Sequence, residues 1–166
     1  VANRSSPLMV NHLRVGAALL LAFAVSAPLR ASEQPASVPV RIAGASRVVV
    51  AHAKTVVPRW DTNKWGDRLI VSRVVLEVEE TLKGGREREL VMDLDGGTLD
   101  GLTLRVSDLQ VLKPGDRAVF FLDGLDGLVF TPHLRGEGIL ELDKTDTVKG
   151  SSLHLSQIRA MARSQR

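Results

Sequence analysis

The clearest alternation of apolar and polar residues runs from Leu69 to Gly85, with the sequence LIVSRVVLEVEETLKGG. Apolar residues hold one parity of this stretch and polar residues mostly hold the other, which is the period-two pattern of a strand with one buried face. The stretch is rich in β-branched residues, and Lys83-Gly84-Gly85 supplies a turn at its end. We therefore predict a long, half-buried strand against which the following segments pair.

Further segments with extended patterns lie on both sides of this strand. Arg47–Val57 opens with an apolar run, which predicts a strand buried on both faces, and Pro58 is expected to stop it. Downstream strands are predicted over residues 88–94, 102–106, 117–122, 128–131 and 136–142.

A short helix is predicted after the last strand. Ser156 is expected to cap a helix over residues 157–164, whose apolar residues Ile158, Met161 and Ala162 would pack on the sheet. These elements predict an all-β fold, namely a five- or six-stranded antiparallel barrel of the oligonucleotide/oligosaccharide-binding (OB) type with a short C-terminal helix. A two-sheet β-sandwich is the alternative.

The N-terminal segment has the build of a secretory signal. Residues 1–14 are polar and basic, and residues 15–27 form an uncharged apolar run that ends in small residues. We expect a signal peptide over residues 1–31, a flexible lead-in over 32–45 and the barrel domain over 46–166. The protein is then exported to the periplasm or the extracellular space, and it touches a membrane only if the signal segment stays uncleaved.

The chain has 166 residues, no cysteine and a formal net charge of +3. Three of its 22 basic residues and none of its 19 acidic residues lie in residues 1–31, so the remainder is formally neutral. Aromatic residues make up only 4% of the chain. Because residues 32–166 have no excess of basic residues and the chain has few aromatic side chains on which bases could stack, a nucleic-acid partner is not expected. Without cysteine, the hydrophobic core must stabilise the exported fold alone.

Both tryptophans fall in the segment from Pro58 to Asp67, which we interpret as a polar loop. An amphipathic set in a chain so poor in aromatics indicates a contact surface for a protein or glycan partner. The alternative is that the tryptophans plug the end of the barrel. The candidate binding residues are Arg59, Trp60, Asp61, Lys64 and Trp65.

No motif in the sequence supports catalysis. The stretch from Asp93 to Gly101 resembles the opening of a calcium loop, but Gly97 and Leu104 stand where such a loop needs ligands, so a tight turn is the preferred interpretation. His52, His133 and His154 show no metal-binding spacing. We therefore expect no catalytic residues, no metal and no cofactor.

Several motifs together carry a resemblance to a known family. They are VVVAHAKTV, IVSRVVLEVEETLKGG, LKPGDRAVFFL and GEGILEL, spanning roughly residues 47–142. This combination resembles a family of uncharacterised exported bacterial β-barrel proteins and, more remotely, the netrin-like modules that include tissue inhibitors of metalloproteinases. The resemblance implies the fold and the exported location. The inhibitors reach a catalytic metal through an N-terminal cysteine, which this chain lacks, so no functional residue carries over.

The expected function is that of an exported, non-enzymatic binding or interaction module. Two alternatives stand beside it. One is a small metal-dependent hydrolase built on His52, His133 and nearby acids. The other is a protease-associated or inhibitor-like protein.

Overall fold

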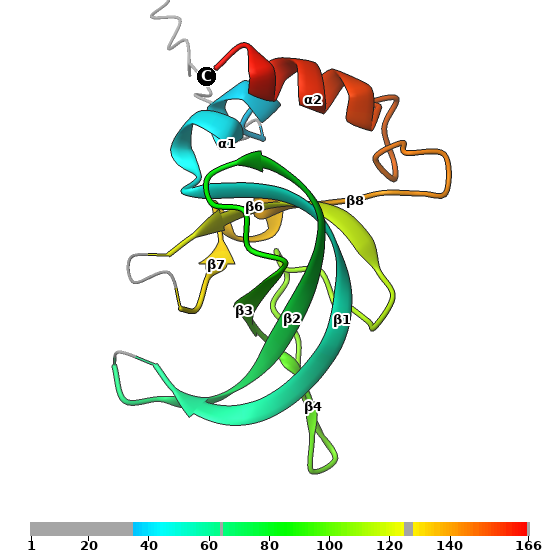
Figure 1. Cartoon of the computed structure of the whole chain (residues 1–166). Coiled ribbons are helices and arrows are strands. Elements are labelled where there is room, and N and C mark those ends of the chain that lie inside the picture. The colour runs from blue at the N-terminus through cyan, green and yellow to red at the C-terminus, as the bar shows by residue number, and fades with distance from the viewer. Residues whose placement is uncertain (1–34, 64, 125–127, 166) are drawn as a thin grey trace, which may run out of the picture. The chain divides into compact units, whose positions relative to one another are not determined.

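The computed structural model describes residues 35–63, 65–124 and 128–165, whose elements all belong to one unit, Gln34–Arg166. The predicted signal segment, residues 1–31, lies outside the described residues. In chain order the elements are α1 (Val38–Gly44), β1 (Arg47–Thr62), β2 (Arg68–Lys83), β3 (Glu89–Asp95), β4 (Gly97–Leu99), β5 (Leu102–Leu104), β6 (Arg117–Asp123), β7 (Thr131–Pro132), the 3-10 turn η1 (Arg135–Gly138), β8 (Ile139–Glu141) and α2 (Leu155–Arg163) (Figure 1). The fold is mostly antiparallel β-sheet with a short C-terminal helix, as predicted.

The main sheet is organised around β1 and β2. Its strand order is β3-β2-β1-β6-β7, with β8 also paired to β6, and every ladder in it is antiparallel. The long strand predicted at residues 69–85 is confirmed as β2, and its residues Val74 and Leu76 are fully buried. A separate two-stranded sheet pairs β4 with β5.

The two outer strands of the main sheet approach each other at one point. Met92 of β3 forms a parallel bridge with Phe130, which directly precedes β7. The Asp93 N–H donates to the Phe130 carbonyl at 2.9 Å, and the Phe130 N–H donates to the Val91 carbonyl at 2.8 Å. Among the described residues the outer strands are thus joined by a bridge and not by a ladder.

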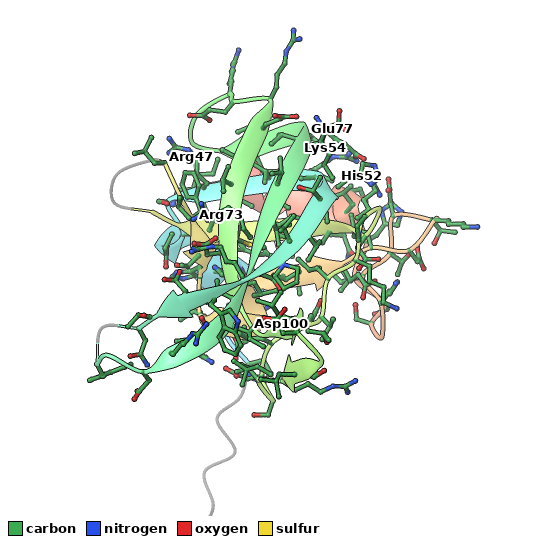
Figure 2. All side chains as sticks on the ribbon, turned by 90° about the horizontal axis from the view of Figure 1, so that it is seen from below. Arg47, His52, Lys54, Arg73, Glu77 and Asp100 are labelled. Atoms are coloured by element: carbon green, nitrogen blue, oxygen red, sulfur yellow. The ribbon has the colours of Figure 1, made fainter. Side chains whose placement is uncertain are left out.

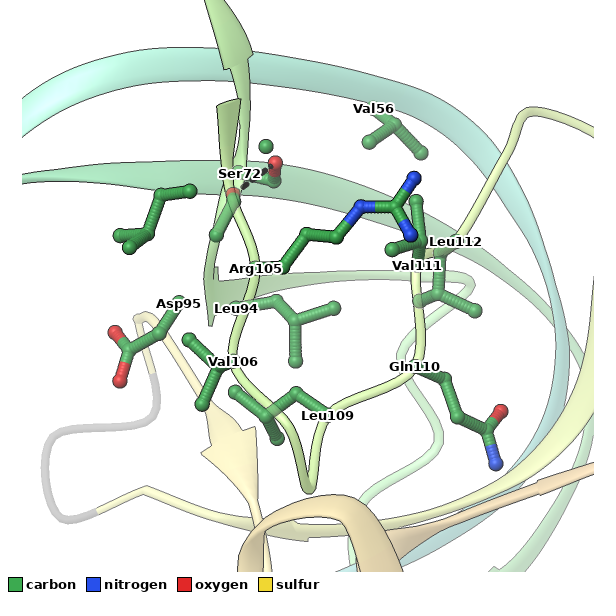
Figure 3. Close-up of a pocket in the computed structure, with 13 residues that line it drawn as sticks. Val56, Ser72, Leu94, Asp95, Arg105, Val106, Leu109, Gln110, Val111 and Leu112 are labelled. Carbon is green, nitrogen blue, oxygen red and sulfur yellow. Dashed lines mark hydrogen bonds between the residues drawn. The ribbon is translucent and has the colours of Figure 1, made fainter. Parts of the chain in front are cut away.

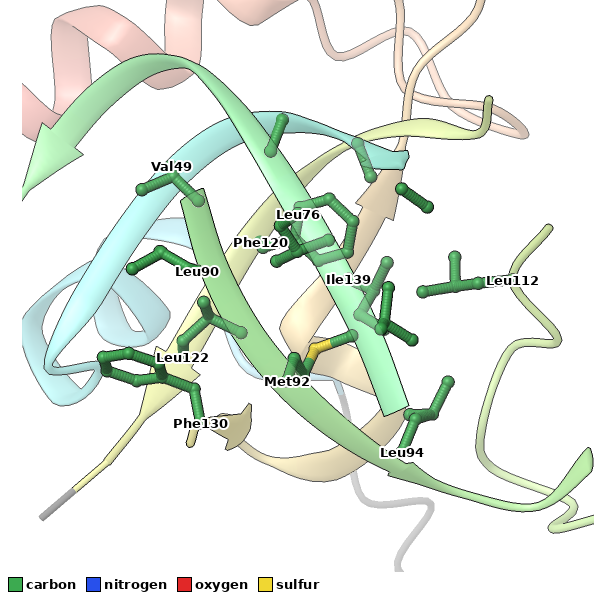
Figure 4. Packing of buried hydrophobic residues seen from close by; sticks show 14 residues of the cluster. Val49, Leu76, Leu90, Met92, Leu94, Leu112, Phe120, Leu122, Phe130 and Ile139 are labelled. Atoms are coloured by element: carbon green, nitrogen blue, oxygen red, sulfur yellow. The ribbon is translucent and has the colours of Figure 1, made fainter. Parts of the chain in front are cut away.

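The start of β1 lies between two hydrophobic layers, which confirms the prediction that it is buried on both faces. Val49 and Ala51 belong to the layer between the strands, together with Phe120 of β6 (Figure 4). Val48 and Val50 belong to a second layer, which α1 and α2 help to form. Period-two alternation therefore sends successive side chains of one strand into different layers.

Helix α2 packs on this second layer. Ile158 and Ala162 are buried and Met161 is partly buried, which confirms the predicted apolar face. The predicted cap was wrong. The helix begins two residues earlier, at Leu155. The side chain of His154 accepts from the Ser156 N–H, and the Gln157 side chain accepts from the His154 N–H. This reciprocal capping box places the N-cap at His154 rather than Ser156.

Residues 38–44 form helix α1 in a segment that the sequence predicted as a flexible lead-in. A helix of seven residues is not stable alone, so tertiary contacts must hold it. Lys83, at the end of β2, donates from Nζ to the carbonyls of Ile42, Ala43 and Ala45 at 2.8, 2.9 and 2.7 Å. These carbonyls would otherwise be unsatisfied at the helix C-terminus.

Arg41 fixes the other side of α1. It is 8% exposed, donates from Nε to the Ala36 carbonyl and from Nη1 to the Glu137 carbonyl, both at 2.7 Å, and lies near the Glu137 carboxylate. Lys83 and Glu137 are distant in sequence, so the local composition of residues 32–45 gave no sign of this anchoring.

Strand β1 runs through Pro58 to Thr62, so the prediction that Pro58 stops the strand was wrong. Beyond Ala53 the side of β1 that faces β6 has no ladder, because β6 pairs only with Arg47–His52. A proline is tolerated where its missing N–H falls on an open edge. The first half of the tryptophan-containing segment, residues 58–62, is therefore strand.

The later strands are shorter than predicted. Gly136–Gly138 belong to η1, so the strand predicted over residues 136–142 is reduced to β8. The strand predicted over 128–131 appears only as the Phe130 bridge and β7.

The Lys83→Met variant should lower the free energy of unfolding by about 1–2 kcal/mol, because three helix carbonyls lose their charged donor while the apolar stem remains. Lys113→Met is the matched control, since Lys113 is exposed in a turn. Chemical denaturation measures both variants. Equal stabilities for the two would contradict the role given to Lys83.

Candidate functional site

The second part of β1 and the first part of β2 form an antiparallel arm, which we define as residues 55–62 and 68–75, and β3 pairs with residues 71–75 of it. Its pairing is regular from Thr55–Val75 to Thr62–Arg68, because the register shifts of β1 all precede Thr55. The arm ends in a tip at residues 63–67, which projects away from the helices (Figure 1). It carries the candidate binding residues.

Asn63 organises the tip. Its side-chain carbonyl accepts from the N–H groups of Trp65 and Asp67, both at 2.9 Å, and its Nδ2 donates to the Asp67 carboxylate at 3.0 Å. The Asn63 N–H donates to the Asp67 carbonyl at 3.0 Å, which closes the loop. Asparagine is suited to this role because its short amide mimics a backbone turn. The described residues of the tip therefore form a turn closed by hydrogen bonds.

Trp65 lies on this turn and is 74% exposed. A single exposed apolar side chain is common on protein surfaces, but tryptophan is the residue type most enriched among interface hot spots. Lys64, the neighbouring candidate, lies outside the described residues.

Trp60 has a different environment, on the core-facing side of the arm. It is half-buried and shares the parity of Val56, which packs against the core. Its Nε1–H donates to the Asp100 carboxylate at 3.1 Å, and the Arg68 guanidinium lies 4.3 Å from the centre of its ring. Trp60 thus links the arm to the β4–β5 hairpin, an environment different from that of the exposed Trp65.

The opposite side of the arm carries an ion-pair network centred on Asp93 of β3. Arg59 Nη2 lies 2.8 Å from Asp93 Oδ2 and 2.7 Å from Asp61 Oδ2, while Arg73 Nε lies 2.9 Å from Asp93 Oδ1. Partial burial acts to raise the pKa of Asp93, but the hydrogen bonds from Arg73 and Arg59 outweigh it and hold that pKa below its usual value. Arg59 and Asp61 are therefore engaged within the protein.

The stretch considered as a calcium loop is a hairpin. Asp100 and Gly101 have φ values of 52° and 77°, and they form the tight turn between β4 and β5. The bulge or tight turn was predicted at Gly96-Gly97 instead, and these glycines, with φ values of 108° and 140°, lie where β3 passes into β4. Asp93 faces arginines while Asp100 faces Trp60, so their carboxylates serve different partners. At Gly97 a Cβ would lie 2.6 Å from Ser72 Oγ, which shows how closely β4 crosses the arm.

The three histidines outside the leader lie apart, each with its own partner. His52 Nε2 lies 2.5 Å from the Glu79 carboxylate, and His133 Nδ1 lies 2.7 Å from the Asp123 carboxylate. His154 caps α2. Figure 2 shows His52 beside Glu77 of the neighbouring strand, away from Asp100. Within residues 35–63, 65–124 and 128–165, no three His, Asp or Glu side chains are grouped to hold a metal.

A small pocket lies between the arm and residues 104–112 (Figure 3). Val56, Leu94, Leu109 and Leu112 line it, and Ser72 Oγ donates to the Gly96 carbonyl at 2.7 Å beside it. Its cavity of about 30 Å³ has room for little more than a water molecule, far below a small-molecule site. The pocket is a packing gap and does not provide a ligand site.

Comparisons with known proteins add no relative. No protein-family model matches the chain, and no curated protein is significantly similar to it. The resemblance to netrin-like modules therefore stays a prediction. Among the helices of the described residues, none has the length and apolar character needed to span a bilayer.

The sequence did not reveal three residues that shape the arm. Asn63 and Asp67 are the two ends of the tip. Both residue types favour turns, and this preference could have indicated a turn limited to residues 63–67. Asp100 is 40 residues from Trp60, and no sequence pattern indicated their contact.

The Asp93→Asn variant should lower the free energy of unfolding by about 1–2 kcal/mol at neutral pH, because two arginines lose an ionised partner. A carboxyl with a lowered pKa stabilises the fold above its unfolded-state pKa, and this contribution disappears as the pH falls through the folded-state value. The stability difference from the unchanged protein should therefore shrink below pH 3.8, the ordinary pKa of this carboxyl.

Denaturation curves measured across this pH range test the prediction. Asp95→Asn is the control, since the ion pair of Asp95 with Arg135 is at 4.0 Å and exposed. A difference for Asp93→Asn that stays constant down to about pH 2 would show that the network does not depend on its ionisation.

Proposed function

We propose that this protein is an exported, non-enzymatic binding module that contacts a protein or glycan partner through the tip of the arm. The observation that carries this proposal is the exposure of Trp65 on a turn whose conformation Asn63 fixes. A binding surface that is already ordered avoids much of the entropy cost of association. A tryptophan held in this way supplies a large contact area, as in many interface hot spots.

The surroundings of Trp65 support this use of the tip. Trp60 and its contacts with Asp100 and Arg68 brace the arm from the core side. The Arg59–Asp93–Arg73 network braces it from the other side. Of the four candidate residues that the structure describes, Trp65 is the proposed contact. Arg59, Trp60 and Asp61 support the arm, and their role in binding is indirect.

The finer fold proposed here is an OB-like barrel rather than a sandwich. The bridge between Met92 and Phe130, with its two backbone hydrogen bonds, supports closure because it joins the outermost strands of the sheet. In OB barrels the loop between the first two strands is among those that contact ligands, and the tip occupies that position here.

Export rests on the three-part pattern of residues 1–31 alone. The mature protein should then begin after Ala31 and reside in the periplasm or outside the cell. N-terminal sequencing of the protein recovered from these fractions tests this, and an unprocessed cytoplasmic product would contradict it.

The Trp65→Ala variant should weaken partner binding at least about 100-fold while costing well under about 1 kcal/mol of stability, because the side chain is exposed in the free protein. The partner is first captured from envelope and culture-medium fractions on the immobilised protein, then purified, and its affinity is measured by titration calorimetry. Val57→Ala is the matched control, an apolar residue of the same arm that is 56% exposed. Equal affinities for Trp65→Ala and Val57→Ala would overturn the proposed function.

A further inference from the structure

The outer edge of β1 between Val56 and Thr62, which we call the open edge, has no strand partner among the described residues, although Val56 lines the same pocket as residues 109–112. On its other side this part of β1 pairs with β2, but β6 pairs only with Arg47–His52. The next residue, Ala53, exchanges backbone hydrogen bonds with Gly115 and Asp116. Past it, no ladder among the described residues covers this edge.

The register of the arm shows which backbone groups point to the open edge. The carbonyl of Ile70 accepts from the Gly96 N–H on the β3 side of β2, so the backbone groups of Ile70 face away from β1. Its partner Trp60 then belongs to a non-hydrogen-bonded pair, and its own N–H and C=O point outward. Because the register is regular, the same holds for every second residue, which gives Val56, Pro58, Trp60 and Thr62.

These outward groups are rich in acceptors and poor in donors. Pro58 has no N–H, and the Thr62 N–H donates to the Asp61 carboxylate at 2.8 Å. Val56 and Trp60 therefore supply the two remaining outward N–H groups, against four outward carbonyls. Among the backbone hydrogen bonds of the described residues outside regular helices and strands, neither of these two N–H groups is a donor.

We propose that this edge binds an extended peptide segment of a partner protein by strand addition. Its four outward carbonyls, repeating about every 7 Å, match the N–H groups along one side of another strand, whereas a glycan has no such repeat. The inference rests on the proposed function and narrows its partner to a polypeptide, because the edge leads directly to Trp65 at the tip. The added strand supplies the donors that the edge lacks.

A second copy of this chain is a poorer occupant. Its edge would bring another Pro58 and another occupied Thr62 N–H, so the carbonyls opposite these positions would lack donors. Proline on an edge strand is a known guard against such self-pairing. A partner strand without proline gives more hydrogen bonds to the same carbonyls.

The test uses a library of random twelve-residue peptides displayed on phage and selected on the purified protein. The tightest peptide is synthesised and then methylated at one backbone nitrogen at a time. Strand addition predicts that methylation at alternate positions weakens binding about tenfold or more, while the intervening positions change it less than about twofold. Methylation leaves the protein itself unchanged, so misfolding cannot produce this pattern.

Hydrogen exchange of the complex gives the second measurement. The N–H groups of Val56 and Trp60 should exchange at least about tenfold more slowly when the peptide is bound. Recovery of no peptide, a methylation profile without period two, or unchanged exchange at both residues would overturn the inference.

The Trp65→Ala variant separates the two proposals. A peptide that loses affinity for Trp65→Ala yet shows no alternating methylation profile contradicts strand addition and leaves the proposed function in place. A profile that alternates while Trp65→Ala binds normally supports strand addition and contradicts the role of the tip.

Discussion

The arrangement of this fold depends on a mismatch in length between two neighbouring strands. β1 has sixteen residues and β6 has seven, so β6 covers only the beginning of β1. Where β1 lies between β2 and β6, both of its faces are buried, and its side chains contribute to two hydrophobic layers. Where β6 is missing, β1 and β2 continue as an arm with one open edge. The core and the candidate site are thus two parts of the same hairpin.

The arm stays ordered because contacts brace it on both sides. On the core side, Trp60 hydrogen bonds to Asp100 of the β4–β5 turn and stacks with Arg68. On the other side, Asp93 is shared between Arg59 and Arg73. A two-stranded hairpin alone is only marginally stable in water, so the part of the arm beyond its pairing with β3 depends on such side-chain contacts. Order of this kind is what a binding surface needs.

Local pattern was sufficient to predict the parts of the fold that depend on burial alone. The alternation in β2, the doubly buried start of β1 and the apolar face of α2 follow from residues next to one another in sequence. Pattern failed where distant residues decide the outcome. Helix α1 depends on Lys83 and Glu137, and the passage of β1 through Pro58 depends on the absence of β6 from that edge. The two tryptophans looked equivalent in sequence, and the contacts of Trp60 with Asp100 and Arg68, which are distant from it or on the other strand, distinguish them.

The open edge of β1 is the central claim, and amide hydrogen exchange of the free protein tests it most directly. The N–H groups of Val57, Arg59 and Asp61 face β2 and should be protected, whereas those of Val56 and Trp60 face outward and should exchange rapidly. The predicted result is therefore alternating protection along residues 56–61, interrupted at Pro58. Uniform protection of these residues, or protection of Val56 and Trp60 in particular, would contradict the account.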